Sequence, residues 1–225
     1  MKFKGRCDFH THTFLSDGEL IPSEHIRRAS FKGYSVIGIT DHVDFSNVEH
    51  VLSAHKKNLK EILKDGKVWD VHPVLGVEIT HVPKNNIKKI AKFAKELGAG
   101  IVIVHGETLA EPVECGTNRA ALECEYVDIL AHPGILSLEE AEIAKSNDIY
   151  LEISARKGHC LANGHVVKVA KQAKADLLVN TDAHSSGDML CSEDAFKIAL
   201  GSGLDENEAF KVVEENPVKF MKRLG

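Results

Sequence analysis

Short runs of aliphatic and β-branched residues alternate along the chain with stretches whose apolar positions recur every three to four residues. The runs predict strands and the longer stretches predict helices between them. Most runs are apolar on both faces, which is typical of a parallel sheet covered by helices. The seven predicted strands cover residues 6–10, 35–40, 72–79, 100–104, 127–131, 149–153 and 177–180.

Local start and stop signals mark the helices between these strands. Pro22 precedes the first helix and Gly33 closes it, while Ser137 and Glu140 form the capping-box pattern at the start of another. The other predicted helices cover residues 48–64, 86–97, 117–123, 165–175, 192–200 and 206–223, the last interrupted near Pro217. No linker or low-complexity tract divides the chain, so we expect one α/β domain over residues 1–225. An open doubly wound sheet and a closed barrel both fit this order.

Composition narrows the class of protein. The chain has 225 residues, of which 43% are hydrophobic, and a formal net charge of -5. This balance gives no basic excess for nucleic-acid binding, which makes a nucleic-acid partner unexpected. Residues 1–6 contain no apolar run typical of a secretory signal, and no stretch approaches the length of a membrane helix. The five cysteines form no Cys-x-x-Cys pair, so we expect free thiols and a cytoplasmic protein with no membrane partner.

Histidines and carboxylates gather at the ends of the predicted strands. His10 and His12 lie two residues apart, which places both imidazoles on the same face of an extended chain. Six of the seven strands end in such residues, and the carboxyl ends of parallel strands meet at one edge. The nine candidates are His10, His12, Asp17, His42, Glu78, His105, His132, Asp182 and His184.

Each candidate alone has an ordinary explanation. Asp182 could cap a helix, Glu78 could form a salt bridge, and a lone histidine is more often a packed or solvated residue than a ligand. Burying so many ionisable groups together without compensating cations would be very costly. Imidazole and carboxylate ligands without a thiolate suit Zn²⁺, Mn²⁺ or Fe²⁺, and nine ligands suit two or three ions.

These residues resemble the motifs of the PHP (polymerase and histidinol phosphatase) family. The similarity spans residues 8–184 and rests on Asp8-x-His10-x-His12 with Ser16-Asp17-Gly18, then Thr40-Asp41-His42, Gly76-Val77-Glu78, His105, His132-Pro133 and Asp182-Ala183-His184. The resemblance implies a distorted (β/α)7 TIM-like barrel with a metal site at the carboxyl-terminal face of the strands. It implies no ligand from the sixth strand.

The resemblance also implies how the ligands are shared. His10, His12, Glu78 and Asp182 would hold the first ion. Glu78 would bridge to a second ion, which His105 and His132 also hold. Asp17, His42 and His184 would hold a third.

The chemistry expected of such a centre is hydrolysis of a phosphate ester by a metal-bridging hydroxide. Asp17 or His184 would help to protonate the leaving group, and we expect Asp8 and Asp41 to orient ligands or strand ends. Arg156 is a candidate substrate-binding residue because its guanidinium fork matches phosphate oxygens, and Arg119 is another because loops on this face commonly carry function. Of the histidines outside the motifs, we expect His81, His159 and His165 to be surface residues more than pocket walls. His25, His50, His55 and His72 receive no role.

Three functions compete at this point. The first is a phosphatase or phosphodiesterase acting on a small phosphorylated metabolite. The second is a 3′-end exonuclease or nucleotide phosphodiesterase, which would need a basic and aromatic track for single-stranded nucleic acid. The third is a non-catalytic barrel that acts as a binding module, which predicts lost ligands, whereas all nine are present. The sequence does not specify the substrate, the native metals, the residue that acts as general acid or the oligomeric state.

Overall fold

A parallel sheet forms the centre of the computed structural model, which describes residues 4–64 and 69–224. Residues 1–3, part of the amino-terminal stretch considered for a signal, lie outside this part of the chain. The strands follow the order β1-β2-β4-β5-β6-β7-β8, and a short strand β3 pairs with β4. Their bounds are β1 (Arg6–Asp8), β2 (Tyr34–Ile39), β3 (His42–Val43), β4 (His72–Ile79), β5 (Ile101–His105), β6 (Ile129–Ala131), β7 (Tyr150–Ser154) and β8 (Leu177–Asn180).

Helices fill the connections between the strands, with ends within two residues of the predicted ones. They are α1 (Pro22–Phe31), α2 (Val48–Ile62), α3 (Ile87–Glu96), α4 (Thr117–Leu122), α5 (Leu138–Ser146), α6 (Asn163–Ala173), α7 (Ser192–Gly201), α8 (Glu206–Phe210) and α9 (Asn216–Leu224). Short turns η1 (Lys84–Asn86) and η2 (His159–Ala162) precede α3 and α6. The capping box of Ser137 and Glu140 is present at α5. Pro217 does not break the last helix; it lies in the first turn of α9, after a π-helical segment η3 (Lys211–Glu215).

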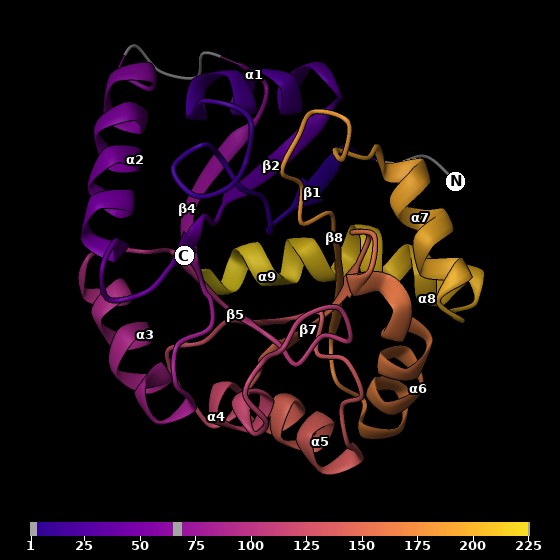
Figure 1. Cartoon of the computed structure of the whole chain (residues 1–225). Coiled ribbons are helices and arrows are strands. Elements are labelled where there is room, and N and C mark those ends of the chain that lie inside the picture. The colour runs from indigo at the N-terminus through magenta and orange to yellow at the C-terminus, as the bar shows by residue number, and fades with distance from the viewer. Residues whose placement is uncertain (1–3, 65–68, 225) are drawn as a thin grey trace.

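The two edges of the sheet come together and nearly close it into a barrel. Thr11, beyond β1, forms a parallel bridge with Ala183, beyond β8. The backbone N–H of His12 donates to the Ala183 carbonyl oxygen at 2.8 Å. Helices α1 to α7 surround the strands, and α9 crosses them (Figure 1). The structure is therefore the distorted (β/α)7 TIM-like barrel that the family resemblance implied.

Side-chain alternation along the strands separates the barrel interior from the layer under the helices. Ile101 and Ile103 belong to an interior cluster that draws on β2, β5, β6, β7 and β8, whereas Val102 and Val104 belong to the outer cluster. Val77 and Ile79 also face outward, so Glu78 between them faces inward. The strand period thus directs the last polar residue of several strands into the carboxyl-terminal mouth of the barrel.

Helix α9 closes the opposite end of the barrel. Phe220 is fully buried, with its ring centroid 4.7 Å from that of Phe9 and 5.0 Å from that of Tyr150. Asn216 donates to the carbonyl oxygen of Leu177, the first residue of β8. Among the described residues, none of the helices is long and apolar enough to cross a membrane.

Candidate metal centre

Glu78 lies at the middle of a buried cluster at the carboxyl ends of the strands. Its Oε2 atom lies 2.9 Å from His42 Nδ1, 3.0 Å from His10 Nε2 and 3.4 Å from His12 Nε2. Its Oε1 atom lies 3.5 Å from His132 Nε2. One fully buried carboxylate therefore contacts four imidazoles, two from the loop beyond β1, one from β3 and one from the end of β6.

Asp182 forms a second carboxylate contact to the same histidines. Its Oδ1 atom lies 3.1 Å from His12 Nε2, and its Oδ2 atom lies 3.7 Å from His132 Nε2. Asp182 and His132 both adopt positive φ angles, 52° and 27°. Such angles are strained for residues with a side chain and persist where the surroundings hold them, commonly at functional sites.

All nine candidate ligands fall into groups whose ligand atoms lie close enough to share an ion. Within each group, these atoms lie within 4.8 Å of one another. Three groups made up only of candidates are His10 with His12 and Asp182; Glu78 with His105 and His132; and His12 with Asp17, His42 and His184. They differ from the ligand sharing that the family resemblance implied in two ways: Glu78 is absent from the group of His10 and Asp182, and His12 also belongs to the group of Asp17, His42 and His184.

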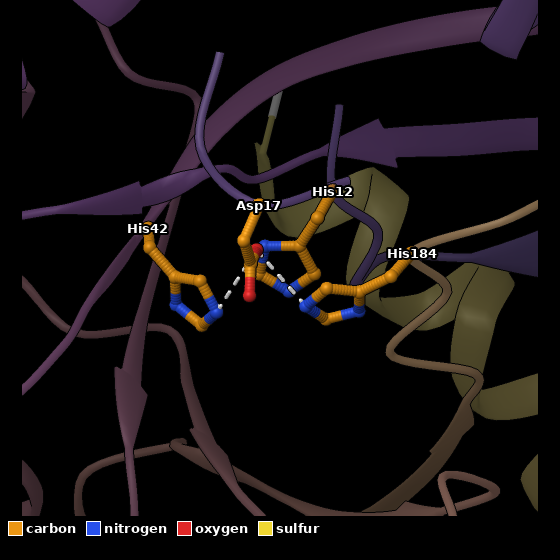
Figure 2. A group of neighbouring side chains, drawn as sticks. All are labelled: His12, Asp17, His42 and His184. Carbon is orange, nitrogen blue, oxygen red and sulfur yellow. Dashed lines mark ion pairs between the residues drawn. The ribbon is translucent and has the colours of Figure 1, made fainter. Parts of the chain in front are cut away.

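The third group is the most open of the three, and its histidines gather around Asp17 (Figure 2). Asp17 Oδ1 lies 3.0 Å from His184 Nε2 and 3.5 Å from His42 Nε2, and the Asp17 side chain is 56% exposed. The loop that carries Asp17 folds back against the end of β1, and Gly18 permits this close approach. A Cβ atom there would lie 2.5 Å from the His12 carbonyl oxygen.

Burial and charge set the protonation of the cluster. Burial alone lowers the pKa of His10, but the Glu78, Glu152 and Asp182 carboxylates outweigh it and raise that pKa well above its usual value. Burial lowers the pKa of His12, and likewise that of His105, to about 4. These two rings are therefore neutral at pH 7 and carry the lone pair that a metal requires.

The carboxylates are held in their charged form. Burial opposes ionisation of Glu78, but His10 and His42 hold its pKa well below the usual range. Burial likewise opposes ionisation of Asp182, but the charge of His10 and the hydrogen-bonding His12 and His159 rings keep its pKa well below the ordinary value. Asp17 also has a lowered pKa, because His184 and His42 outweigh its partial burial.

Several buried ligand atoms have no hydrogen-bonding partner among the described residues. They are His10 Nε2, both ring nitrogens of His12, both carboxylate oxygens of Glu78, Asp182 Oδ1 and His132 Nδ1. Each unpaired buried polar atom costs about 1–3 kcal/mol. Five of these atoms face one another, all except the Nδ1 atoms of His12 and His132, and cations between them would remove this cost, so the donor set fits divalent metals. The orphaned atoms belong to the first two groups.

Buried carboxylates orient the candidate ligands, or residues next to them, by accepting hydrogen bonds on the side away from the cluster. Glu152, on β7, accepts a hydrogen bond from His10 Nδ1 at 2.7 Å, which directs His10 Nε2 toward Glu78. Asp8 accepts hydrogen bonds from the backbone N–H and hydroxyl of Thr181, next to Asp182. A charged residue between apolar neighbours in the centre of a buried strand is the sequence signal that could have identified Glu152.

Asp41 organises the loop beyond β1. It accepts hydrogen bonds from the backbone and hydroxyl of Thr13, from Ser16 Oγ and from His55 Nε2. His55 and His25, to which the sequence assigned no role, are both fully buried. His25 Nε2 lies 2.8 Å from Thr11 Oγ1, so both histidines support the segment that carries His10 and His12.

The two candidate substrate-binding arginines lie in different surroundings. Arg156, after β7, donates from Nη1 to His184 Nδ1 at 2.7 Å and to the Asp182 carbonyl oxygen at 3.2 Å. Arg119, on α4, pairs with Glu123 at 2.8 Å and with Glu139 at 3.0 Å. The structure thus brings Arg156 to the cluster and directs Arg119 toward glutamates on α4 and α5.

One expectation about the remaining histidines is wrong. His159 is buried, not a surface residue: its Nδ1 lies 3.1 Å from Asp182 Oδ2 and its Nε2 lies 3.2 Å from Glu111 Oε1. Turn η2 folds His159 under the mouth of the barrel, which no local sequence signal indicates. His165 is partly buried, and its Nε2 contacts the Leu136 carbonyl oxygen.

Residues 8–139 match the PHP domain. The chain belongs to the PHP family. An uncharacterised protein of Methanocaldococcus jannaschii is 48% identical over 97% of this chain and 100% of its own length. A probable phosphatase of Thermoanaerobacter sp. (strain X514) is 30% identical, over 89% of this chain and 87% of its own length. Ribonuclease P protein component 3 of Methanosarcina barkeri is 27% identical, over 96% of this chain and 88% of its own length.

Solved structures share the fold of this PHP family chain. A chain of archaeal ribonuclease P with mature tRNA aligns over 96% of this chain and 89% of its own, with a TM-score of 0.67 and 18% identity. Histidinol phosphate phosphatase from Lactococcus lactis, complexed with zinc, L-histidinol and phosphate, aligns over 98% of this chain and 94% of its own. Its TM-score is 0.56 and its identity is 16%. At these identities the likeness concerns the fold.

Proposed function

We propose that this PHP-family phosphoesterase hydrolyses the phosphate ester of a small metabolite with the help of two or three divalent ions, of zinc, manganese or iron. The observation that carries the proposal is the set of orphaned nitrogen and oxygen atoms around Glu78, in a member of this family. The relative described as a probable phosphatase supports the reaction type. When bound, such ions supply charge stabilisation for phosphate oxygens and lower the pKa of water.

The proposed ligand assignment is the one that the family resemblance implies, and it adds Glu78 to the group of His10, His12 and Asp182 because of its contacts to His10 and His12. His10, His12, Glu78 and Asp182 hold the first ion, and Glu78, His105 and His132 hold the second. Asp17, His42 and His184 form the third position. All three groups lie at the carboxyl ends of the strands of one barrel, so we expect a phosphate bound there to contact ions of more than one group.

The chain's own residues bind the phosphate and move the proton. Arg156 lies beside His184 with a guanidinium that can form a fork to phosphate oxygens, so we assign it the role of phosphate clamp. His184 Nδ1 lies 2.7 Å from Arg156 Nη1 and 2.9 Å from the Asp182 carbonyl oxygen, and its Nε2 lies 3.0 Å from Asp17 Oδ1. When Nε2 carries the ring proton, His184 can pass that proton to the leaving oxygen. Since Nε2 cannot hold an ion and a proton together, occupation of the third position and proton donation by His184 are alternatives.

The first experiment tests the dependence on metal. The purified protein, loaded in turn with Zn²⁺, Mn²⁺ or Fe²⁺, is assayed against a panel of phosphorylated metabolites and p-nitrophenyl phosphate. Exhaustive chelation is expected to abolish phosphate release, and restored metal should recover it. Hydrolysis that continues after exhaustive chelation would contradict the proposal.

The second experiment counts ions in two variants. Glu78→Ala is expected to lose two ions because Glu78 contacts ligands of both buried groups, whereas His42→Ala should lose at most one. Elemental analysis after gel filtration provides the count. Equal metal content in both variants would break the assignment of Glu78 as the bridge. If the wild type and His42→Ala both bind two ions, the third position is empty and His184 is free to act as the proton donor.

A nucleic-acid substrate is the second candidate function. It is favoured by the relatives described as ribonuclease P protein component 3, which match over most of their length. The net charge of -5 and the acidic surroundings of the site oppose it. Assays of single-stranded RNA and DNA, run beside mononucleotides, separate the two functions: polymer degradation at a matching rate would favour the second.

A further inference from the structure

A group of side chains at the rim of the metal centre lies outside the nine candidate ligands. Glu111, in the loop between β5 and α4, is its centre. Glu111 Oε2 lies 3.2 Å from His81 Nε2 and 3.2 Å from His105 Nε2. Glu111 Oε1 lies 3.2 Å from His159 Nε2. The ligand atoms of His81, His105 and Glu111 all lie within 4.8 Å of one another.

The contact between His105 and Glu111 differs from the other two. The His81 and His159 contacts have hydrogen-bond geometry, whereas the His105 contact is only a close approach of the two atoms. His105 Nδ1 faces the Gly106 carbonyl oxygen at 3.2 Å, so in the neutral ring it carries the proton. The unprotonated Nε2 then lies 3.2 Å from a carboxylate oxygen with no proton between the two atoms, an arrangement that a cation bound to both would stabilise.

The geometry matches that of a metal ligand set. Two ligands of a tetrahedral ion with bonds of about 2.0–2.1 Å lie roughly 3.3 Å apart, close to the separations at Glu111. Two imidazoles and one glutamate form the His₂Glu set of sites that keep an open position. His81 also has a positive φ angle, 51°, which it shares with the candidate ligands His132 and Asp182.

Exposure distinguishes this group from the buried positions. The side chains of His81 and Glu111 are 43% and 39% exposed, whereas that of His105 is 2% exposed. Glu78 and His132, the other members of the buried group that contains His105, are inaccessible or nearly so. His105 belongs to both groups, and its Nε2 atom can hold only one ion at a time.

We propose that His81, Glu111 and His105 form an entry site for divalent ions, from which His105 passes the ion to Glu78 and His132. An ion that approaches His105 from solvent meets His81 and Glu111 first, because these two are the exposed members of the group that contains His105. His159 holds the second oxygen of Glu111 and thereby directs Oε2 toward the two imidazoles. This inference rests on the proposed metal centre and adds the route by which it fills.

The test follows metal uptake instead of hydrolysis. Metal-free protein is mixed with Co²⁺ in a stopped-flow instrument, and loading is read from the ligand-field absorption. Glu111→Gln and His81→Gln are each expected to slow loading of the position that contains His105 by about tenfold or more, as loss of metal-site partners commonly does. The number of ions bound at equilibrium should equal that of the wild type.

Glu114→Gln is the matched control. Glu114 lies in the same loop but contacts Lys84, at 3.0 Å from its backbone nitrogen and 3.5 Å from Nζ, so this variant should load within twofold of the wild type. A His132→Ala background removes the buried destination. There the ion is expected to remain at the rim with a spectrum that Glu111→Gln abolishes.

The outcomes separate the two proposals. Wild-type loading rates in Glu111→Gln and His81→Gln overturn the entry site, as does loss of a bound ion at equilibrium in either variant. A wild-type protein that takes up no Co²⁺ overturns the proposed metal centre itself.

Discussion

Glu152 holds the His10 ring from the side opposite Glu78, and it is fully buried. Asn180 donates to the same Glu152 oxygen at 3.0 Å, which fixes the carboxylate in place. A carboxylate behind a metal-binding imidazole fixes its tautomer and raises its basicity. The sequence prediction that β7 supplies no direct ligand stays a prediction, but the strand supplies this support.

Glu152→Gln is therefore expected to weaken metal binding while leaving the fold intact. Loss of the negative charge behind His10 should lower affinity at the first position by about 10–100-fold. Titration against a competing chromophoric chelator measures the change. Glu142→Gln, an exposed substitution on α5, serves as the control, and equal affinity in both variants would contradict the role of Glu152.

Asp41 makes a second residue-scale prediction, which concerns stability. Burial opposes its ionisation, but His55 and Ser16 hold the pKa of Asp41 below its usual 3.8. A depressed pKa contributes stability that is present above the unfolded value and is lost as the pH falls through the folded value. In metal-free protein, Asp41→Asn should lower the free energy of unfolding by about 2–3 kcal/mol at pH 7.

The same comparison at lower pH tests the cause. The difference between the wild type and Asp41→Asn should shrink as the pH falls below about 4, because Asp41 is then protonated in the unfolded chain. Urea unfolding at several pH values measures it. Asp148→Asn, at an exposed position with a positive φ angle that asparagine tolerates, should change stability by less than about 0.5 kcal/mol. A pH-independent difference would remove the electrostatic explanation.

At the scale of elements, α9 contributes to the stability of the barrel at the end opposite the candidate metal centre. It covers the amino-terminal end of the strands, where Phe220 fills the interior between Phe9 and Tyr150. The metal cluster lies at the other end. The sequence predicted this helix from its apolar periodicity but not its place, because only packing decides which barrel end a terminal helix covers.

Phe220→Ala is expected to destabilise the protein by about 3–5 kcal/mol through the cavity that it leaves. Metal stoichiometry should remain that of the wild type under native conditions. Denaturant unfolding and elemental analysis measure the two quantities. Phe31→Ala removes a ring that is 81% exposed and should cost less than about 0.5 kcal/mol. A loss of bound ions in folded Phe220→Ala would show that the two barrel ends are coupled.

For the whole molecule, the cluster couples folding to metal. Seven buried atoms of candidate ligands lack hydrogen-bonding partners among the described residues, and cations would bind only where the fold assembles them. A ligand that binds only the folded state at 100 times its Kd adds about 2.7 kcal/mol. For a chain of this size that corresponds to a rise in melting temperature of roughly 5–10 °C.

Thermal unfolding of metal-free and metal-replete protein tests this coupling. Chelation should lower the melting temperature, and adding Zn²⁺ or Mn²⁺ to the metal-free protein should raise it with ion concentration. Mg²⁺, which prefers oxygen ligands, should be less effective than either. An unchanged melting temperature in all conditions would contradict a metal-binding cluster.

The sequence by itself determined the succession of strands and helices along the chain and the edge at which the polar residues meet. Strand ends such as those at Glu78 and His105 could be placed because the two-residue period and the parallel arrangement are local properties of the chain. Tertiary structure alone decided which groups surround them. His159 and Glu111 reach the centre through loops, and Glu152 faces it from within a strand. Their positions depend on contacts between segments distant in sequence, which no local pattern encodes.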